Sequence, residues 1–453
     1  MRWMLILLFM VATLPAAEPI LDQWYVGDLG GQPAISLHQV SLAEEGGGRS
    51  SSVDLEILIH RKLGNRDVTL GIQEYQRFTE DAAGRLVTFS FDHRESGDIS
   101  LATGRVSGRR VEGTLSHLGR TSGFIIDLKP GEELIGDLAA QELLKPLTDA
   151  KIVSRSLAFV ANQVVVARTT ASYLGREGTN DQWDLLVDVM PIPMQLHLDN
   201  ARRMTGMRMA LGPMVLDLRQ SPGPVVLAGA DLSPAGLVAA AGPTPNVTGT
   251  NRFRLPVGAQ VPSDEFQLFV GTDVTIRGQA AFAPLVDRDS WLGAEANLEL
   301  DDPAMKHWAL TAAGSEGTDD VRAERLRLAV RSHIKHKDMT VADGTALQTF
   351  RNQRGDCTEH ATLLCAALRI AGIPARIEVG VVYAPGFGGW VGHAWTSAFA
   401  EGRWRHLDAA YPGIDRCRYI ALGRASGNTG GGASAALVGI LVGVWGKKIE
   451  TLP

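Results

Sequence analysis

Apolar and polar residues alternate with a period of two along much of the first half of the chain. The alternation is seen over residues 51–60, 67–78, 84–93 and 108–117, with turn-forming clusters between them, and it is typical of β-strands. A second stretch of this kind covers residues 152–218, whereas 130–145 has helical spacing. We therefore expect a large, antiparallel, β-rich region over residues 18–220.

The pattern changes after residue 220. A stretch rich in Pro, Gly and Ala without a clear period comes first, and short strand-like runs follow at 253–257, 265–270 and 273–278. This pattern indicates a linker and a small β segment over 221–300. Residues 319–335 have helical spacing, and both helix and strand patterns follow. We expect a separate domain over 301–453 and assign the whole chain to the α+β class.

The N-terminus has the features of an export signal. Arg2 is followed by the apolar run Trp3–Val11 and by small residues, with a plausible cleavage point after Ala16 or Ala17. The apolar run is shorter than the about 20 residues that a membrane-spanning helix needs. We expect a cleaved signal peptide over residues 1–17, no transmembrane span, and a periplasmic or secreted protein.

Composition narrows the function classes. The 453 residues are 45% hydrophobic and 21% charged, which excludes a disordered, collagen-like or disulfide-scaffold protein. With 44 basic and 50 acidic residues the net charge is −6, so no basic surface for nucleic acid is expected. The three cysteines leave at least one thiol unpaired.

One of these thiols is predicted at the start of a buried helix. Asp356 and Glu359 have the spacing of a capping box, and the apolar run after them ends at Gly372, the expected C′ glycine. Cys357 then lies in the first turn. There the free N–H groups and the helix dipole favour a thiolate, so we expect a lowered thiol pKa.

A β-hairpin follows this helix. Residues 393–399 and 403–411 are strand-like, and Glu401–Gly402 between them are typical of a turn. A hairpin closed at this turn pairs Trp395 with Asp408. His393 then lies diagonal to Asp408 on the same face, roughly 7–8 Å away at the backbone. A helix-terminal thiol, an imidazole and a carboxylate that orients it are the groups that nucleophilic catalysis requires.

The motifs that carry these groups resemble a known family. GDCTEHATLLCAALRIAGIPARIEVGVVY, then GHAW and RWRHLDAA, are similar to the core of the transglutaminase-like superfamily, papain-related cysteine enzymes with a Cys–His–Asp triad. The resemblance covers residues 319–422. It implies that Cys357 is the nucleophile, His393 the general base and acid, and Asp408 the orienting carboxylate. Relatives often have Asp-Pro at the last motif, whereas Ala409 follows Asp408 here.

The resemblance also implies a fold. The C-terminal domain is expected to be a papain-like transglutaminase core, in which a helix packs on an antiparallel β-sheet. The β-rich region before it is similar to the extension of exported bacterial relatives.

Further residues are candidates for the site. The backbone N–H of Cys357 is a natural oxyanion donor at the helix start, and Gln353 is a candidate for the second donor. Trp390, on an expected mobile loop over residues 386–393, is a candidate substrate contact. Trp395 is either a second substrate-side residue that shields the triad from water or an ordinary core aromatic.

Two alternatives concern the cysteines and a metal. The group Cys357, Glu359, His360 and His393 could bind zinc, but the triad explains the same residues with fewer assumptions, so we expect neither metal nor cofactor. Cys365 is expected in the core. A Cys365–Cys417 disulfide remains open.

The expected function is acyl transfer on amide bonds by an exported cysteine enzyme, with hydrolysis of peptide or isopeptide bonds as the leading hypothesis. The alternatives are a protein-glutamine transamidase that cross-links proteins, and a non-catalytic domain that binds peptide or cell wall. The expected partner is a peptide or protein substrate, and a component of the cell envelope is a further candidate.

Overall fold

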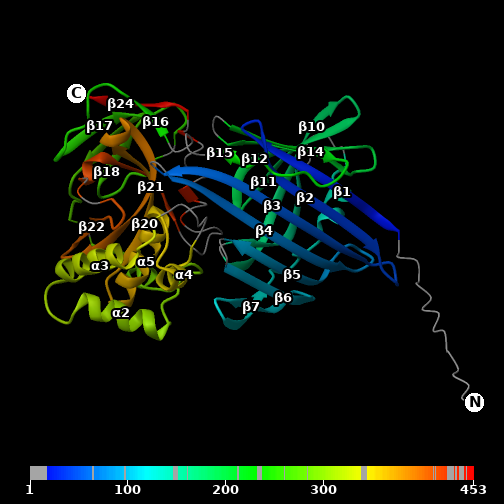
Figure 1. Cartoon of the computed structure of the whole chain (residues 1–453), viewed down its shortest axis with the longest axis horizontal. Helices are drawn as coiled ribbons and strands as arrows, with labels where there is room; N and C mark the ends of the chain where they lie inside the picture. The colour runs from blue at the N-terminus through cyan, green and yellow to red at the C-terminus, as the bar shows by residue number, and fades with distance from the viewer. Residues whose placement is uncertain are drawn as a thin grey trace, which may run out of the picture.

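A computed structural model describes most of the chain from residue 18 onward. It does not describe residues 1–17, where the signal peptide is predicted, or the stretches 64–65, 96–97, 146–150, 161, 212–213, 232–236, 260, 283, 338–343, 412, 414, 426–432, 434–435, 438–442 and 445. A β-rich N-terminal region and a C-terminal region of mixed helices and strands lie side by side (Figure 1). This division confirms the large β-rich N-terminal region that the alternating pattern predicts.

One large sheet contains nearly all of the N-terminal strands. Its order is β8-β7-β6-β5-β4-β3-β2-β1-β14-β13-β12-β11-β10-β9, and the short β15 adds to β3. Neighbouring strands on this path are also neighbours in sequence, except where β1 pairs with β14. The strands are β1 (Pro19–Leu29), β2 (Gln32–Ala43), β3 (Arg49–Leu63), β4 (Arg66–Glu80), β5 (Leu86–Glu95), β6 (Asp98–Ser107), β7 (Arg110–His117), β8 (Arg120–Asp127), β9 (Lys151–Val160), β10 (Gln163–Glu177), β11 (Asn180–Val187), β12 (Met190–Leu198), β13 (Met204–Leu211), β14 (Met214–Ser221) and β15 (Ala230–Asp231).

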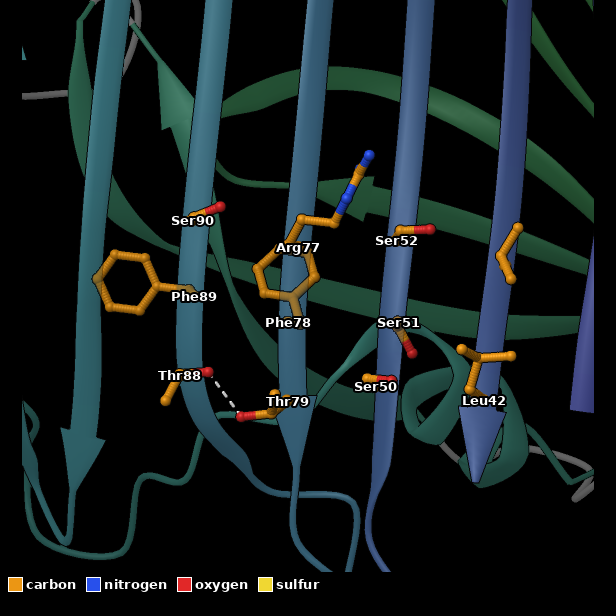
Figure 2. Close-up of a pocket in the computed structure, with 11 residues that line it drawn as sticks. Leu42, Ser50, Ser51, Ser52, Arg77, Phe78, Thr79, Thr88, Phe89 and Ser90 are labelled. Atoms are coloured by element: carbon orange, nitrogen blue, oxygen red, sulfur yellow. Dashed lines mark hydrogen bonds between the residues drawn. The ribbon is translucent and has the colours of Figure 1, made fainter. Parts of the chain in front are cut away.

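The two faces of this sheet differ in polarity, as the alternating sequence requires. Phe89 and Phe91 on β5 are buried against Phe78 of β4. The opposite face exposes hydroxyl groups, and Thr79 and Thr88 are hydrogen-bonded across the strands (2.6 Å; Figure 2). A pocket at this point is lined by serine and threonine residues of neighbouring strands together with Val40, Leu42, Arg77, Phe78 and Phe89.

The C-terminal region is built on a second sheet. Its order is β18-β19-β17-β24-β16-β21-β20-β23, with β22 paired to β21. The strands are β16 (Leu237–Ala241), β17 (Thr250–Arg254), β18 (Gln267–Val270), β19 (Asp273–Arg277), β20 (Ala375–Ala384), β21 (Gly389–Ala400), β22 (Arg403–Leu407), β23 (Tyr419–Ala425) and β24 (Lys448–Leu452). The sheet therefore runs across the boundary expected at residue 300, because β16 pairs directly with β21.

Helices cover part of this second sheet. They are α2 (Pro303–Ala313), α3 (Asp319–His333), α4 (Ala346–Asn352) and α5 (Cys357–Ile370), and α1 (Asp137–Leu143) lies in the N-terminal region. The four C-terminal helices gather on one side of β20 and β21 (Figure 1). Helix α5 is nearly all buried and is tied to β21 by a hydrogen bond from Thr396 to the Ala361 carbonyl (3.0 Å). No helix in the described part of the chain is long and apolar enough to cross a membrane.

Turns of the N-terminal sheet contact the helices that lead to α5. Asp98, at the start of β6, accepts hydrogen bonds from Gln348 and Asn352 of α4. Arg120, at the start of β8, forms an ion pair with Asp302, the N-cap of α2 (2.6 Å). The N-terminal region therefore helps to fix α2 and α4 in place.

Candidate active site

Helix α5 begins and ends where its sequence predicts. The Asp356 side chain accepts hydrogen bonds from the N–H groups of Thr358 and Glu359, and Glu359 accepts from the Asp356 N–H (2.8 Å). At the other end Gly372 has φ 78°, the left-handed conformation of a C′ glycine. The capping box satisfies the second and third N–H groups of the helix and does not use that of Cys357, the first residue.

The thiol of Cys357 does not have the lowered pKa that its place at the helix start predicts. Burial raises its pKa well above the ordinary value, and the charge of Asp356 adds to this effect. A hydrogen bond from the backbone N–H of Ala394 acts in the opposite direction. The expectation of a lowered pKa is therefore wrong for the unliganded protein, because desolvation of the thiolate outweighs the helix terminus.

The hairpin has the expected register. Thr396 pairs with Leu407 and Ala400 with Arg403, so the turn is Glu401–Gly402 as predicted. β22 ends at Leu407, and Asp408 comes directly after the last ladder pair. This register brings the His393 Nε2 and Asp408 Oδ2 atoms to 2.7 Å. Both side chains are buried.

Asp408 is held on both of its oxygens. Oδ1 accepts from the backbone N–H groups of Ala410 and Tyr411 (2.8 Å each), and Oδ2 accepts from the Tyr419 hydroxyl (2.8 Å). Burial opposes ionisation, but the interaction with His393 and the hydrogen bond from the Tyr411 N–H outweigh it and lower the pKa of Asp408 to about 2. The carboxylate is thus negative at neutral pH.

Tyr419 is a site residue that the sequence did not reveal. It lies on β23, which is separated from Asp408 by an irregular connection. No spacing rule relates the two residues, because only the sheet order places β23 beside β20. The Tyr419 ring also lies 5.9 Å from the His393 ring.

Two arginines of α3 fix the chain after Asp408. Arg327 donates to the Asp408 carbonyl (3.1 Å), and Arg331, one helical turn later, donates to the carbonyls of Ala409 and Ala410 (3.4 and 3.3 Å). The arginine contacts therefore restrain the turn that follows Asp408, where the chain has Ala409 and Ala410.

The two tryptophans occupy different environments. Trp395 is 1% exposed, and its ring lies over His393 (centroids 6.2 Å apart), consistent with exclusion of water from the His–Asp pair. Trp390 is 0% exposed and packs against Phe253 and Tyr383. The expected loop over 386–393 is wrong from Gly389 onward, because β21 begins at that residue. Trp390 has no surface for a substrate, and we do not retain it as a contact.

Gln353 lies at the C-cap of α4, four residues before Cys357. Its backbone is left-handed (φ 53°), and its carbonyl accepts from the N–H groups of Lys335 and His336 (2.9 and 3.1 Å). The backbone that precedes the thiol is therefore anchored, and the role of the Gln353 side chain stays a prediction.

The other cysteines are free thiols in the core. Cys365 and Cys417 are both buried, and neither forms a disulfide. Burial raises the pKa of Cys365 to about 11 and that of Cys417 to about 12. Neither thiol is suited to act as a nucleophile.

No group of three or more metal-ligating side chains occurs among the residues that the structure describes. His360, a member of the alternative zinc group, has its Nδ1 beside the Asp356 carbonyl (2.5 Å). Burial lowers the pKa of His360 to about 4, so this imidazole is neutral.

These contacts define an α+β domain in which a thiol, an imidazole and a carboxylate gather near the start of one helix. Residues 306–409 match the transglutaminase-like superfamily. This part of the chain is therefore a transglutaminase-like domain, as its motifs predict. Members of the superfamily are generally cysteine-type enzymes.

Solved structures are similar at low identity. A candidate cysteine protease from Cytophaga hutchinsonii is 15% identical, with 46% of this chain and 84% of that chain covered and a TM-score of 0.31. A β-barrel-like protein with a domain of unknown function, from Brucella abortus, is 12% identical, with 45% and 96% covered and a TM-score of 0.31. No curated protein is significantly similar to the chain.

The turn before Cys357 provides a test of local strain. Gly355 has φ 151°, and a Cβ atom there would lie 2.2 Å from the Cβ of Glu359, which the helix backbone holds in place. We expect Gly355→Ala to lower the free energy of unfolding by about 3 kcal/mol or more, measured by urea denaturation. The control is Gly372→Ala at the other end of α5, where φ is 78° and no atom lies within 4 Å. It should cost only about 1–2 kcal/mol, and equal losses would contradict the proposed collision.

Proposed function

We propose that the protein is a cysteine enzyme that transfers acyl groups from amide bonds, with Cys357, His393 and Asp408 as its catalytic triad. The observation that carries this proposal is the buried 2.7 Å contact between His393 and Asp408. His393 lies on β21, and the next residue of that strand, Ala394, donates its backbone N–H to the Cys357 thiol. The match to the transglutaminase-like superfamily supports the same assignment.

The first step follows from the orientation of His393. Its Nε2 faces Asp408, so Nδ1 is the nitrogen available to the thiol. Asp408 keeps the proton on Nε2, which leaves Nδ1 as a base. As the sulfur of Cys357 attacks the amide carbon, Nδ1 takes the thiol proton, and the carbonyl oxygen becomes an oxyanion.

The second step breaks the C–N bond. The backbone N–H of Cys357 stabilises the oxyanion, and the Gln353 side chain is the proposed second donor. His393 gives its proton to the leaving amine, and a thioester of Cys357 remains. Water activated by His393 then releases the carboxylic acid and restores the thiol.

We propose peptide or isopeptide hydrolysis as the overall reaction, in the periplasm or outside the cell, and peptide or protein as the substrate. Because the pKa of the Cys357 thiol is raised, this thiol carries its proton before the attack. We therefore propose that His393 removes the proton as the sulfur attacks, and that no thiolate forms beforehand.

Whether water or an amine accepts the acyl group is tested with fluorescent casein as acyl donor, with and without dansylcadaverine as amine acceptor. Release of peptides without dansyl incorporation is the expected result. Incorporation of dansylcadaverine that depends on Cys357 would identify a transamidase instead. A protein that neither cleaves nor labels casein, and whose Cys357 is also inert toward a peptide chloromethyl ketone, would be a binding module and not an enzyme.

The protonation state of the thiol is tested by alkylation. We expect iodoacetamide to modify Cys357 slowly at pH 7 and faster as the pH rises above 9, because burial raises the pKa of this thiol and only the thiolate reacts. Peptide mass spectrometry measures the rate at each pH, with Cys357→Ala as the control for label on other residues. A rate already at its plateau at pH 6 would show a preformed thiolate–imidazolium pair and contradict the prediction.

A further inference from the structure

A buried arginine lies behind the hairpin that carries Asp408. Arg416, in the 3-10 turn η4 (Arg416–Arg418), is only 3% exposed. One of its nitrogens donates to the Tyr419 carbonyl (2.6 Å), and its guanidinium lies 4.7 Å from the Phe266 ring. Its Nε has no hydrogen-bond partner among the described residues. A buried charge in this situation is strongly unfavourable unless an opposite charge accompanies it.

Two carboxylates that attract Arg416 are engaged by other cations. Asp264 and Glu378 attract Arg416, but both form ion pairs with Arg376 and Arg424 instead. Within the described part of the chain, no carboxylate oxygen is found within the 4 Å of an ion pair with Arg416. Its charge therefore has only distant compensation.

Arg416 lines a cavity of about 300 Å³. The other lining residues are Phe266, Gly278, Gln279, Ala280, Arg403, Trp404, Arg405, His406 and Asp415. A water molecule occupies about 30 Å³ in the liquid, so the cavity has room for a small solute.

Other polar atoms around this cavity are also unsatisfied. The Nε of Arg403 and both ring nitrogens of His406 are buried and have no hydrogen-bond partner among the described residues. Arg405 differs, because it forms an ion pair with Asp320 (3.1 Å). Among the described residues, the cavity wall thus combines two arginines that have no paired carboxylate and a histidine whose ring nitrogens have no hydrogen-bond partner.

We propose that this cavity is a binding site for a small oxyanion, a carboxylate or phosphate group held by Arg416 and Arg403 with His406 as a further donor. Asp415 also lines the cavity, and its carboxylate repels negative charge. The ligand should therefore present a hydroxyl group on that side, as hydrogen phosphate or a hydroxy acid does. This proposal does not depend on the chemistry of Cys357.

The site is separate from the thiol but close to the His–Asp pair. The His406 ring lies 4.4 Å from the Tyr419 ring, and the Tyr419 hydroxyl donates to Asp408. Burial and the charge of Arg416 lower the pKa of His406 to about 3, so this imidazole is neutral when the cavity is empty. A bound anion would favour its protonated form.

The test is calorimetric titration of the purified protein with inorganic phosphate and, separately, with glycolate, at constant ionic strength maintained with sodium chloride. The informative variant is Arg403→Gln, because this half-buried side chain can change without exposing the core. The matched control is Arg405→Gln. It alters the same wall of the cavity, but Arg405 is already paired with Asp320. Circular dichroism verifies that both variants are folded.

We expect at least one of the two anions to bind, with affinity at least tenfold weaker in Arg403→Gln and within threefold of the parent in Arg405→Gln. Binding of phosphate alone or glycolate alone identifies which oxyanion the cavity prefers. Absence of binding for both anions would overturn the proposal. So would equal affinity in the Arg403→Gln variant, since the anion would then bind elsewhere.

Discussion

Replacement of Cys357 by alanine is expected to abolish amide cleavage, with a fall in kcat/KM of at least ~10³-fold, because no other group can form the thioester. Turnover of fluorescent casein measures the loss. Mass spectrometry should also find no peptide chloromethyl ketone bound at residue 357 of the variant. The fold should be largely unaffected, because the substitution removes one sulfur atom from the first turn of α5 and leaves its capping box in place.

The control for this variant lies on the same helix. Cys365→Ala removes a thiol that is buried two turns later, and we expect full activity with a stability loss of about 1 kcal/mol for the small cavity. Activity that survives in Cys357→Ala but is lost in Cys365→Ala would show that the wrong cysteine has been assigned.

Replacement of Asp408 by asparagine is expected to lower kcat by about 10⁴-fold while the protein stays folded. The backbone N–H groups of Ala410 and Tyr411 both require an acceptor at Oδ1, so the amide nitrogen of the asparagine must take the place of Oδ2. It then donates to Nε2 of His393, and the imidazole proton moves to Nδ1. His393 can no longer accept the thiol proton.

Tyr419→Phe is the graded comparison for this variant. It removes one hydroxyl hydrogen bond to Asp408 and leaves the charge and tautomer intact, so the expected loss is only about tenfold, from a net hydrogen bond of about 1.5 kcal/mol. Casein turnover for both variants measures the difference. Activity of Asp408→Asn within threefold of the parent would contradict the assigned tautomer and remove Asp408 from the triad.

Local features of the candidate site were predictable because they depend on neighbours in sequence. The capping box of α5 involves residues three apart, and the Gly372 end depends on one glycine conformation. The register of the hairpin follows from a two-residue turn. Since these short-range contacts fix His393 and Asp408 on one face, their hydrogen bond was predictable as well.

The electrostatic state of the thiol was not predictable in the same way. A helix terminus is visible in sequence, and it argues for a thiolate. The depth at which the terminus is buried is not visible, and it depends on how α5 packs against β21. Trp390 illustrates the same limit, because its burial depends on Phe253, more than a hundred residues earlier in the chain.

The sequence by itself determined the local elements that carry Cys357, His393 and Asp408 and singled out these three residues as candidates, because caps, turns and strand periods act over a few residues. Only the tertiary structure brought in Tyr419, the α3 arginines and the cavity around Arg416. These contacts join separate segments of the chain, and the order of strands in the sheet and the packing of helices on it decide which of those segments meet.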